Sequence, residues 1–346
     1  MAFDDGFVDF RSDTVTRPTA EMRRAMADAV VGDDVFRGDP TVNRLQEEAA
    51  AVLGFEAALF VPSGVMANQL CVMAQTRHGD EVICDPLAHI KNIERGASSA
   101  FSGVAYRTVD SDAGFITAAH IDGVMELAGR FHPRVRLACW ENTHNFSGGR
   151  VVPVEVMQQG FAAADAHGLS KHVDGARLFN AAVALGVEAA EIVRGADTVS
   201  FCFSKGLGAP VGSAVVGSAE MIEEVRYLRA RMGGGMRQVG ILAAAASIAL
   251  RDRARLSEDH DLARHLASEL ADRQSDLVDP ESVETNIVNI RAAAIVRPWP
   301  QLAADFEREG IAVYPPFDQR FRVVTHRDVD RDDVDRLVDI VTRPAE

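Results

Sequence analysis

Two charged residues, Lys205 and Asp174, stand where short apolar runs give way to glycine-containing turns. Lys205 is one of only three lysines and lies two positions after the β-prone run 199–203, so its amine is expected at the end of a buried strand. A lysine amine that is partly removed from water is a candidate for covalent chemistry with an aldehyde. Taken alone, a lysine on an exposed loop is the simpler interpretation, so the case for chemistry depends on a partner.

Asp174 supplies that partner. It lies 31 positions before Lys205 (205 − 174), which leaves room for a crossover helix near 178–193 and a return strand. Both residues then lie at the carboxyl ends of parallel strands, where open α/β sheets bind ligands. A lysine for an aldehyde and a carboxylate for a ring nitrogen suit pyridoxal phosphate. A charge pair about 4 Å apart is worth roughly 4 kcal/mol, or about three pKa units, which would keep the pyridine nitrogen protonated.

The pattern of elements that must position these residues predicts an α/β fold. Apolar runs separated by helical patterns predict a mainly parallel sheet covered on both faces, with strands near 57–61, 81–84, 104–108, 136–140, 171–173, 198–203 and 213–216. A long helical pattern covers 239–271. The rest predicts strands at 286–291, 312–314 and 322–325 and helices at 299–309 and 330–341. We therefore expect a large domain (15–253) and a small α+β domain (254–346), with an N-terminal arm (1–14) packing near the latter.

The composition narrows the class of protein. The 346-residue chain is 47% hydrophobic and carries a net charge of −15, which argues against nucleic-acid or anionic-membrane partners. Its four cysteines lie singly in apolar runs, so we expect no metal site and free thiols in a reducing cytoplasm. A signal peptide and a membrane-spanning run are not expected, and the predicted location is cytoplasmic.

Two glycine-containing turns could bind anions. Ser63, Gly64 and Val65 join a predicted strand to a helix, where free backbone N–H groups would suit a phosphate, although many such turns look alike. Gly233–Gln238 offers three glycines and Arg237 for a ligand or a neighbouring subunit, with a plain turn as the alternative. No GxGxxG follows the first strand, which counts against a dinucleotide.

Four further side chains could act on a substrate. Arginine binds carboxylates in a bidentate manner, so Arg177 or Arg322 could hold an amino acid, unless they only form surface ion pairs. His89 and His132 could stack on a ring or transfer a proton, although each alone is more often structural.

Together these segments resemble the L-threonine aldolases, in the aromatic amino acid β-eliminating lyase/threonine aldolase group of the fold-type-I pyridoxal-phosphate enzymes. The resemblance covers nearly the whole chain, through the motifs at 11–18, 32–35, 39–41, 63–64, 141–145, 174–177, 204–208, 233–238 and 322–326.

The resemblance implies a set of residue roles. Lys205 attaches the cofactor aldehyde, Asp174 pairs with the ring nitrogen, His89 stacks on the ring, and His132 lies near the substrate hydroxyl. The remaining roles fall to residues that bind the phosphate (Ser63, Gly64, Val65), the substrate carboxylate (Ser12, Arg177, Arg322) and the cofactor region of a partner subunit (Arg237). A homotetramer built as a dimer of dimers is implied.

Several positions depart from the family pattern. The usual tyrosine and glycine are Phe36 and Arg37, the usual phosphate-turn threonine is Val65, and an aromatic residue is replaced by Ile93. The lysine usual before the triple glycine falls at Ala230, where Arg229 or Arg231 could substitute, and His132 lies one place later than expected. The cofactor chemistry therefore looks intact, whereas the substrate entrance looks altered.

The predicted reaction is cleavage of a β-hydroxy-α-amino acid, such as L-threonine or L-allo-threonine, into glycine and an aldehyde. The proton acceptor is left open among His89, His132 and a water. Two alternatives stay open: β-elimination or racemisation with the same cofactor, and a protein that binds pyridoxal phosphate without turnover.

Overall fold

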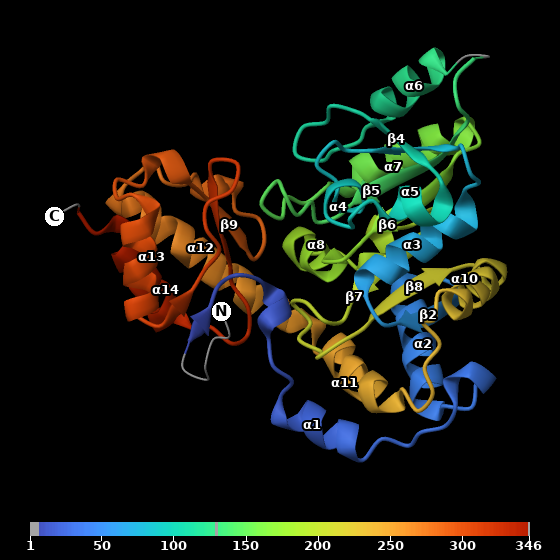
Figure 1. Cartoon of the computed structure of the whole chain (residues 1–346), viewed down its shortest axis with the longest axis horizontal. Helices are drawn as coiled ribbons and strands as arrows, with labels where there is room; N and C mark the ends of the chain where they lie inside the picture. Colours follow the sequence, from blue (N-terminus) through green and yellow to red (C-terminus); the bar gives the residue numbers. More distant parts are fainter. Residues whose placement is uncertain (1–6, 129–130, 345–346) are drawn as a thin grey trace.

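A seven-stranded sheet forms the centre of the larger part of the molecule (Figure 1). This computed structural model describes residues 7–128 and 131–344. The strand order is β2-β8-β7-β6-β5-β3-β4, and β8 runs antiparallel to both of its neighbours while the other pairs are parallel. The strands are β2 (Ala57–Val61), β3 (Glu81–Cys84), β4 (Ala105–Thr108), β5 (Val135–Glu141), β6 (Ser170–Asp174), β7 (Thr198–Cys202) and β8 (Ser213–Gly217). The predicted α/β class and mainly parallel sheet are confirmed.

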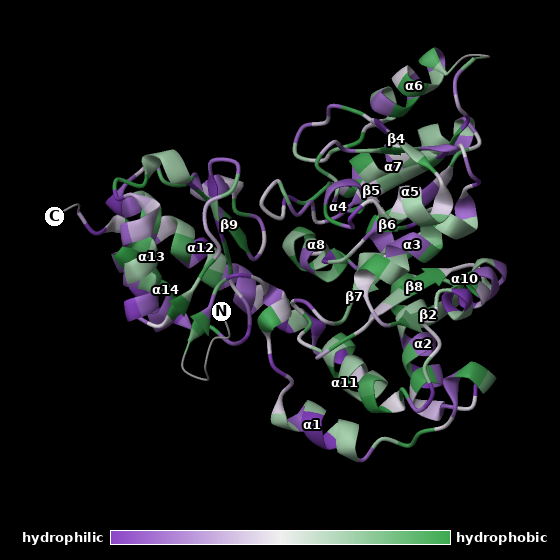
Figure 2. Ribbon diagram, in the orientation of Figure 1, coloured by the Kyte–Doolittle hydropathy of each residue, from purple (hydrophilic) through white to green (hydrophobic). Residues whose placement is uncertain are grey.

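Helices cover both faces of this sheet. Alternate residues of β2 show why: Leu59 and Val61 join the apolar cluster beneath α3 and α10, whereas Ala58 and Phe60 join the cluster on the opposite face. In Figure 2 the strand β8 is largely hydrophobic, whereas the helix α10 mixes hydrophilic and hydrophobic residues. The helices of this part are α1 (Ala20–Ala27), α2 (Pro40–Leu53), α3 (Gly64–Gln75), α4 (His89–Asn92), α5 (Ala97–Ser102), α6 (Ala118–Leu127), α7 (Val154–Ala166), α8 (Leu178–Leu185), α9 (Ala189–Ile192), α10 (Ala219–Arg231) and α11 (Gly240–Arg251).

Two of the predicted helices are each divided in two. The crossover helix expected at 178–193 ends at Gly186, whose φ of +66° closes α8 before α9 begins. The helical pattern at 239–271 stops at Asp252, and a 3₁₀ turn, η3 (Arg253–Arg255), leads into α12 (Leu256–Arg273). Periodicity alone did not reveal either break, because both flanking segments keep apolar residues at helical spacing.

The C-terminal part builds a second apolar cluster around α12, α13 (Trp299–Arg308) and α14 (Arg331–Thr342). Its antiparallel pair is β9 (Ile287–Arg291) with β11 (Arg320–Val324), and the N-terminal strand β1 (Val8–Asp9) pairs in parallel with β10 (Ile311–Ala312). The strand predicted at 312–314 is therefore shorter and earlier than expected. We propose to keep the domain division at residues 253 and 254, which falls inside η3.

The structure also shows whether any described helix could cross a membrane and what state the cysteines are in. Of the helices in the described residues, none is long and apolar enough to cross a membrane. The four cysteines, Cys71, Cys84, Cys139 and Cys202, are buried free thiols. Burial raises the pKa of Cys71 and Cys84 to about 12, so these two thiols stay protonated at neutral pH.

Candidate active site

Lys205 and Asp174 lie on neighbouring strand ends, as the sequence predicts. Strands β6 and β7 are parallel neighbours, and Asp174, the last residue of β6, is in register with Ser200. Lys205 follows β7 on a turn in which its carbonyl accepts a hydrogen bond from the Gly208 N–H (2.8 Å). The turn is tight, because a Cβ atom on Gly206 would come within 2.8 Å of Leu256. Within residues 7–128 and 131–344, no hydrogen bond or ion pair engages the Lys205 amine.

The Asp174 carboxylate is buried and ionised. One oxygen accepts a hydrogen bond from Asn68 Nδ2 (2.8 Å), and the other accepts one from the Ala176 N–H (3.1 Å). Burial by itself would raise the pKa of Asp174, but the charges of His89 and Lys205 and the Asn68 hydrogen bond outweigh it and lower the pKa. A negative charge is therefore held where a protonated ring nitrogen could pair with it.

Asn68 connects this carboxylate to a buried polar network that the sequence did not reveal. Its carbonyl oxygen accepts hydrogen bonds from Ser200 Oγ (2.6 Å) and His172 Nε2 (3.1 Å). Burial lowers the pKa of His172 to about 4, so its ring is neutral at pH 7. Because every polar atom of Asn68 is engaged, the orientation of Asp174 is fixed.

His89 is held by a second buried carboxylate, that of Glu94. The oxygens of Glu94 accept hydrogen bonds from His89 Nδ1 (2.9 Å), Asn68 Nδ2 (2.8 Å) and Gln69 Nε2 (2.6 Å). Burial alone would lower the pKa of His89, but the hydrogen bond to Glu94 and the charge of Asp174 raise it. Ligand-type atoms of His89, Glu94 and Asp174 lie within 4.8 Å of one another, yet amide donors already occupy the carboxylates. The arrangement suits proton transfer better than metal binding.

The N-terminus of α3 has the form of a phosphate-binding turn. Ser63 caps the helix, with its hydroxyl oxygen accepting the Met66 N–H (3.2 Å). A Cβ atom on Gly64 would come within 2.8 Å of Cys202 Sγ, so only glycine fits there without displacement. Backbone N–H groups at the start of a 12-residue helix favour an anion. Val65, 40% exposed, offers no hydroxyl at this turn.

The two ends of the cofactor site are joined by α3 itself. Gly64 lies in the phosphate turn, and Asn68 donates a hydrogen bond to Asp174, the proposed partner of the ring nitrogen. The two residues are four positions apart on this helix, which corresponds to about 6 Å along its axis. Gly64 also faces Cys202, the last residue of β7, three positions before Lys205. The residues present therefore fit a phosphorylated pyridine aldehyde.

A cluster of guanidinium groups lies beside this site. Arg177 pairs with Asp13 through two hydrogen bonds, Nε to Oδ2 (2.8 Å) and Nη2 to Oδ1 (2.6 Å). Burial alone would raise the pKa of Asp13, but Arg177 lowers it far below its usual range. Asn145 Oδ1 accepts hydrogen bonds from Arg177 Nη1 (3.3 Å) and from Arg322 Nη2 (3.0 Å).

Arg322 retains an unused donor. Its Nε is buried and has no hydrogen-bond partner among the described residues, and burial together with the charge of Arg177 lowers its pKa to about 10. Ser12 precedes Asp13, and its hydroxyl oxygen accepts the Thr14 N–H (3.2 Å). The fold thus brings the three predicted carboxylate ligands, Ser12, Arg177 and Arg322, to one cluster.

Comparison with known proteins identifies the family. Residues 9–293 match the model of the family described as Beta-eliminating lyase. A relative from Arabidopsis thaliana, named probable low-specificity L-threonine aldolase 2, is 43% identical over 349 residues, covering 96% of this chain and 95% of the relative.

The chain belongs to the beta-eliminating lyase family.

Two further comparisons concern a solved structure, which shows a similar fold, and a second relative. A solved structure of Leishmania major threonine aldolase has a TM-score of 0.82 at 20% identity and covers 97% of this chain and 98% of that chain. A relative named alanine racemase TOXG, from Cochliobolus carbonum, is 32% identical over 345 residues, covering 96% of this chain and 86% of the relative. The predicted fold, lyase class and pyridoxal 5′-phosphate cofactor are confirmed for this lyase.

One predicted residue is not brought to the lyase site of its own chain. His132 is exposed and lies just before β5, whereas Glu141, the last residue of β5, lies beside Asp174. The seven residues of β5 separate the two edges of the sheet by about 23 Å. Within one chain, His132 therefore lies at the edge opposite Lys205, because it is in the loop before a strand, and its role near a substrate hydroxyl stays a prediction.

The loop Gly233–Gln238 is likewise not engaged with Lys205 in the described part of the chain. Arg237 is exposed and donates to Asp33 Oδ2 (3.1 Å), which leaves its predicted role toward a partner subunit a proposal. Arg229 is buried and donates to the Phe60 carbonyl (2.7 Å) and to Asp34 Oδ2 (2.7 Å). It is therefore not an outward substitute for the lysine missing at Ala230, and only the exposed Arg231 keeps that role open.

The substituted entrance positions are mostly at the surface. Phe36 is 79% exposed and Ile93 is 46% exposed. Arg37 adopts a left-handed backbone conformation with φ of 57° and pairs with Glu223 on α10. These side chains do not fill the cofactor site from within the chain.

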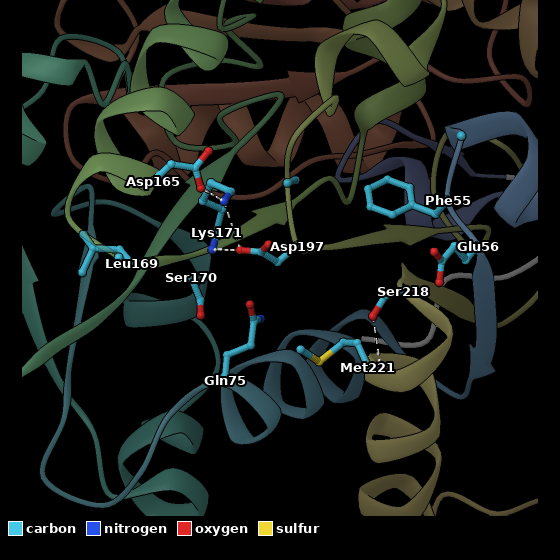
Figure 3. Close-up of a pocket in the computed structure, with 13 residues that line it drawn as sticks. Phe55, Glu56, Gln75, Asp165, Leu169, Ser170, Lys171, Asp197, Ser218 and Met221 are labelled. Carbon is cyan, nitrogen blue, oxygen red and sulfur yellow. Dashed lines mark hydrogen bonds and ion pairs between the residues drawn. The ribbon is translucent and has the colours of Figure 1, made fainter.

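A large cavity of about 560 Å³ lies at the opposite edge of the sheet (Figure 3). Lys171, near the start of β6, is buried there between Asp165 and Asp197, with 3.4 Å between Lys171 Nζ and Asp197 Oδ2. The amine of Lys171 is thus engaged by carboxylates, and Asp174 lies at the far end of the same strand. The volume of this cavity is therefore no guide to the active site, which we place at the edge of the sheet that carries Lys205.

Proposed function

We propose that this lyase cleaves L-threonine, L-allo-threonine or a related β-hydroxy-α-amino acid into glycine and an aldehyde. The observation that carries the proposal is the ionised, buried Asp174 beside Lys205, with the two guanidinium groups of Arg177 and Arg322 at the same edge. The name of the 43% identical relative supports the same reaction.

The residues at the ring end would hold the cofactor. Lys205 would attach its aldehyde, Asp174 would pair with its ring nitrogen, and the turn Ser63–Val65 would bind its phosphate. Pyridoxal 5′-phosphate, when bound, supplies the conjugated ring that accepts the electron pair of the broken bond. The charges of His89 and Lys205 and the hydrogen bond from Asn68 keep Asp174 ionised despite its burial, which favours the protonated ring nitrogen.

The remaining residues would bind and orient the substrate. Arg177 and Arg322 would hold the α-carboxylate with Ser12, which limits rotation about Cα and fixes which bond is broken. His89 is the titratable ring that the fold places beside Asp174, and Glu94 holds its Nδ1. We therefore assign the β-hydroxyl proton to His89 Nε2 in preference to His132.

Replacement of the attaching lysine tests this proposal. Lys205→Ala should lower the rate of threonine cleavage by roughly 10³-fold or more, because the covalent route is lost. Borohydride reduction of the wild-type protein should trap cofactor on Lys205. Lys91→Arg and Lys171→Arg each remove a primary amine but keep the charge, so trapping should persist in both. Wild-type cleavage rates in Lys205→Ala would refute the proposal.

Two related reactions are the second candidate. The family description and the relative named alanine racemase favour β-elimination or racemisation as alternatives on the same site. The products distinguish them: glycine with an aldehyde supports the aldolase, whereas a 2-oxo acid supports elimination and an inverted α-carbon supports racemisation.

We further propose that the active form is a cytoplasmic homotetramer. Support comes from the exposed apolar side chains of Val35 and Phe36, of which Val35 lies beside Gly235 in the loop Gly233–Gln238. The buried free thiols support a reducing compartment. Sedimentation of the holoenzyme at several concentrations would test the assembly.

A further inference from the structure

Asn145 lies between Arg177 and Arg322, the two arginines proposed to bind the substrate carboxylate. Its amide oxygen accepts from Arg177 Nη1 (3.3 Å) and from Arg322 Nη2 (3.0 Å). Because both partners are donors, the oxygen and not the amide nitrogen must face them. A single neutral oxygen thus occupies a position where two guanidinium groups converge.

The loop that carries Asn145 is fixed to the rest of the site. The Asn145 N–H donates to Glu141 Oε1 (2.9 Å), and the other oxygen of Glu141 accepts the His89 N–H (2.7 Å). Glu141 therefore ties Asn145 to the backbone of His89. The amide oxygen is a built part of the site and not the end of a loose loop.

The charges of the cluster do not cancel. Arg177 and Arg322 contribute two positive charges and Asp13 contributes one negative charge, which leaves an excess of one. Two further charged groups act on this pair, Lys205 on Asp13 and Glu141 on Arg177, and they oppose each other in sign. The buried Nε of Arg322 is also without a partner among the described residues. An incoming carboxylate would supply both the missing charge and the missing acceptor.

We propose that Asn145 is a specificity-determining residue that reserves this subsite for a ligand with one carboxylate. Its neutral amide holds the guanidinium groups together without neutralising them, so the excess positive charge stays available. An aspartate at this position would neutralise the cluster and repel the substrate carboxylate. The inference rests on the proposed function, since it takes the cluster as the subsite for an amino acid.

The experiment compares glycine with glycinamide, which lacks the carboxylate charge. Both ligands are titrated into the holoenzyme, and binding is followed by the absorbance of the bound cofactor. The wild-type protein should prefer glycine, and Asn145→Asp should reduce that preference at least about tenfold, because the new charge opposes only glycine. Asn43→Asp, the same change on helix α2 away from the cluster, should keep the wild-type preference.

The variant Asn145→Ala distinguishes the charge of the arginine cluster from the hydrogen bonds that Asn145 accepts. It leaves the charge of the cluster unchanged, so the preference for glycine should remain within about threefold of wild type. Loss of the bridge should lower the melting temperature of the cofactor-free protein, whereas Asn145→Asp should raise it. The inference is overturned by an unchanged preference in Asn145→Asp, by loss of the preference in Asn145→Ala, or by an unchanged melting temperature in Asn145→Ala.

These measurements can refute the role of Asn145 independently of the proposed reaction. Binding of glycine and glycinamide involves no turnover, and the melting temperature needs no cofactor. Threonine cleavage with an unchanged preference in Asn145→Asp would refute the role of Asn145 alone. A shifted preference without cleavage of any β-hydroxy amino acid would refute the proposed function alone.

Discussion

The two ends of the active site are built in different ways. At the ring end, Asp174, Glu94 and His89 are joined through Asn68, and the carboxylate oxygens and the Asn68 amide have hydrogen-bond partners. At the carboxylate end, Arg322 keeps a buried Nε without a described partner and the local charge is unbalanced. The first end is complete before anything binds, whereas the second is completed by its ligand. Affinity for the cofactor and choice of substrate are therefore separable properties.

The ring end should be the more sensitive to loss of charge. Asp174→Asn keeps the shape of the side chain but removes the charge that pairs with a ring cation, an interaction worth about 4 kcal/mol. We expect kcat for threonine cleavage to fall roughly 10³-fold. Steady-state kinetics of the cofactor-saturated variant would measure this, and a change below tenfold would show that the ring end does not depend on the charge.

At the carboxylate end, the buried pair of Asp13 with Arg177 should matter most for stability. Asp13→Asn leaves Arg177 without its counter-ion and should lower the free energy of unfolding by about 3 kcal/mol, near the lower end for broken buried pairs because asparagine still accepts a hydrogen bond. Denaturant unfolding would measure it. Asp9→Asn, which affects the more exposed pair with Arg11, is the matched control and should cost below about 1 kcal/mol.

This pair also sets a pH dependence. The pKa of Asp13 is lowered by folding, so its contribution is present above the unfolded pKa of about 4 and is lost as the pH falls toward the folded value. Acid unfolding of Asp13→Asn should lack this component. An identical acid limb in both proteins would show that the pair does not control stability.

A smaller effect should appear at His89. Its pKa is raised in the folded protein, so the stability it contributes is present below the unfolded pKa of about 6.5 and is lost as the pH rises through the folded pKa. Glu94→Gln should remove much of this dependence and cost about 1.5 kcal/mol below pH 6. Titration of the His89 ring by NMR should show a lower pKa in Glu94→Gln, and an unshifted titration would contradict the assignment.

The smallest effect is expected at Ser12. Ser12→Ala removes one proposed carboxylate ligand, worth about 1 kcal/mol of binding free energy, so KM should rise roughly fivefold with kcat nearly unchanged. An effect on kcat as large as that of Asp174→Asn would remove the distinction between the two ends.

The two ends also differ in how far the sequence predicts them. Lys205, Asp174 and Gly64 follow strands whose apolar runs are readable, so their meeting at one edge follows from parallel topology. Asp13 and Asn145 lie in the motifs 11–18 and 141–145, but their contacts with the arginines were not predicted, because Arg177 and Arg322 lie 164 and 177 positions away from them along the chain. For His132 the residue type suits the chemistry, but a residue before a strand lies, within its own chain, at the edge opposite Lys205, so its predicted role is not supported by topology.

The pairing of β1 with β10 affects the order in which the molecule is completed during synthesis. Val8 leaves the ribosome early, but its partner Ile311 is translated 303 residues later, about 15 to 60 s at usual elongation rates. Residues 63–205, which supply the ring end, are finished well before that. Ser12 and Asp13, directly after β1, have to wait for it. In a nascent chain of this enzyme, the residues proposed to hold the cofactor are therefore all translated long before the proposed amino-acid cluster can be completed.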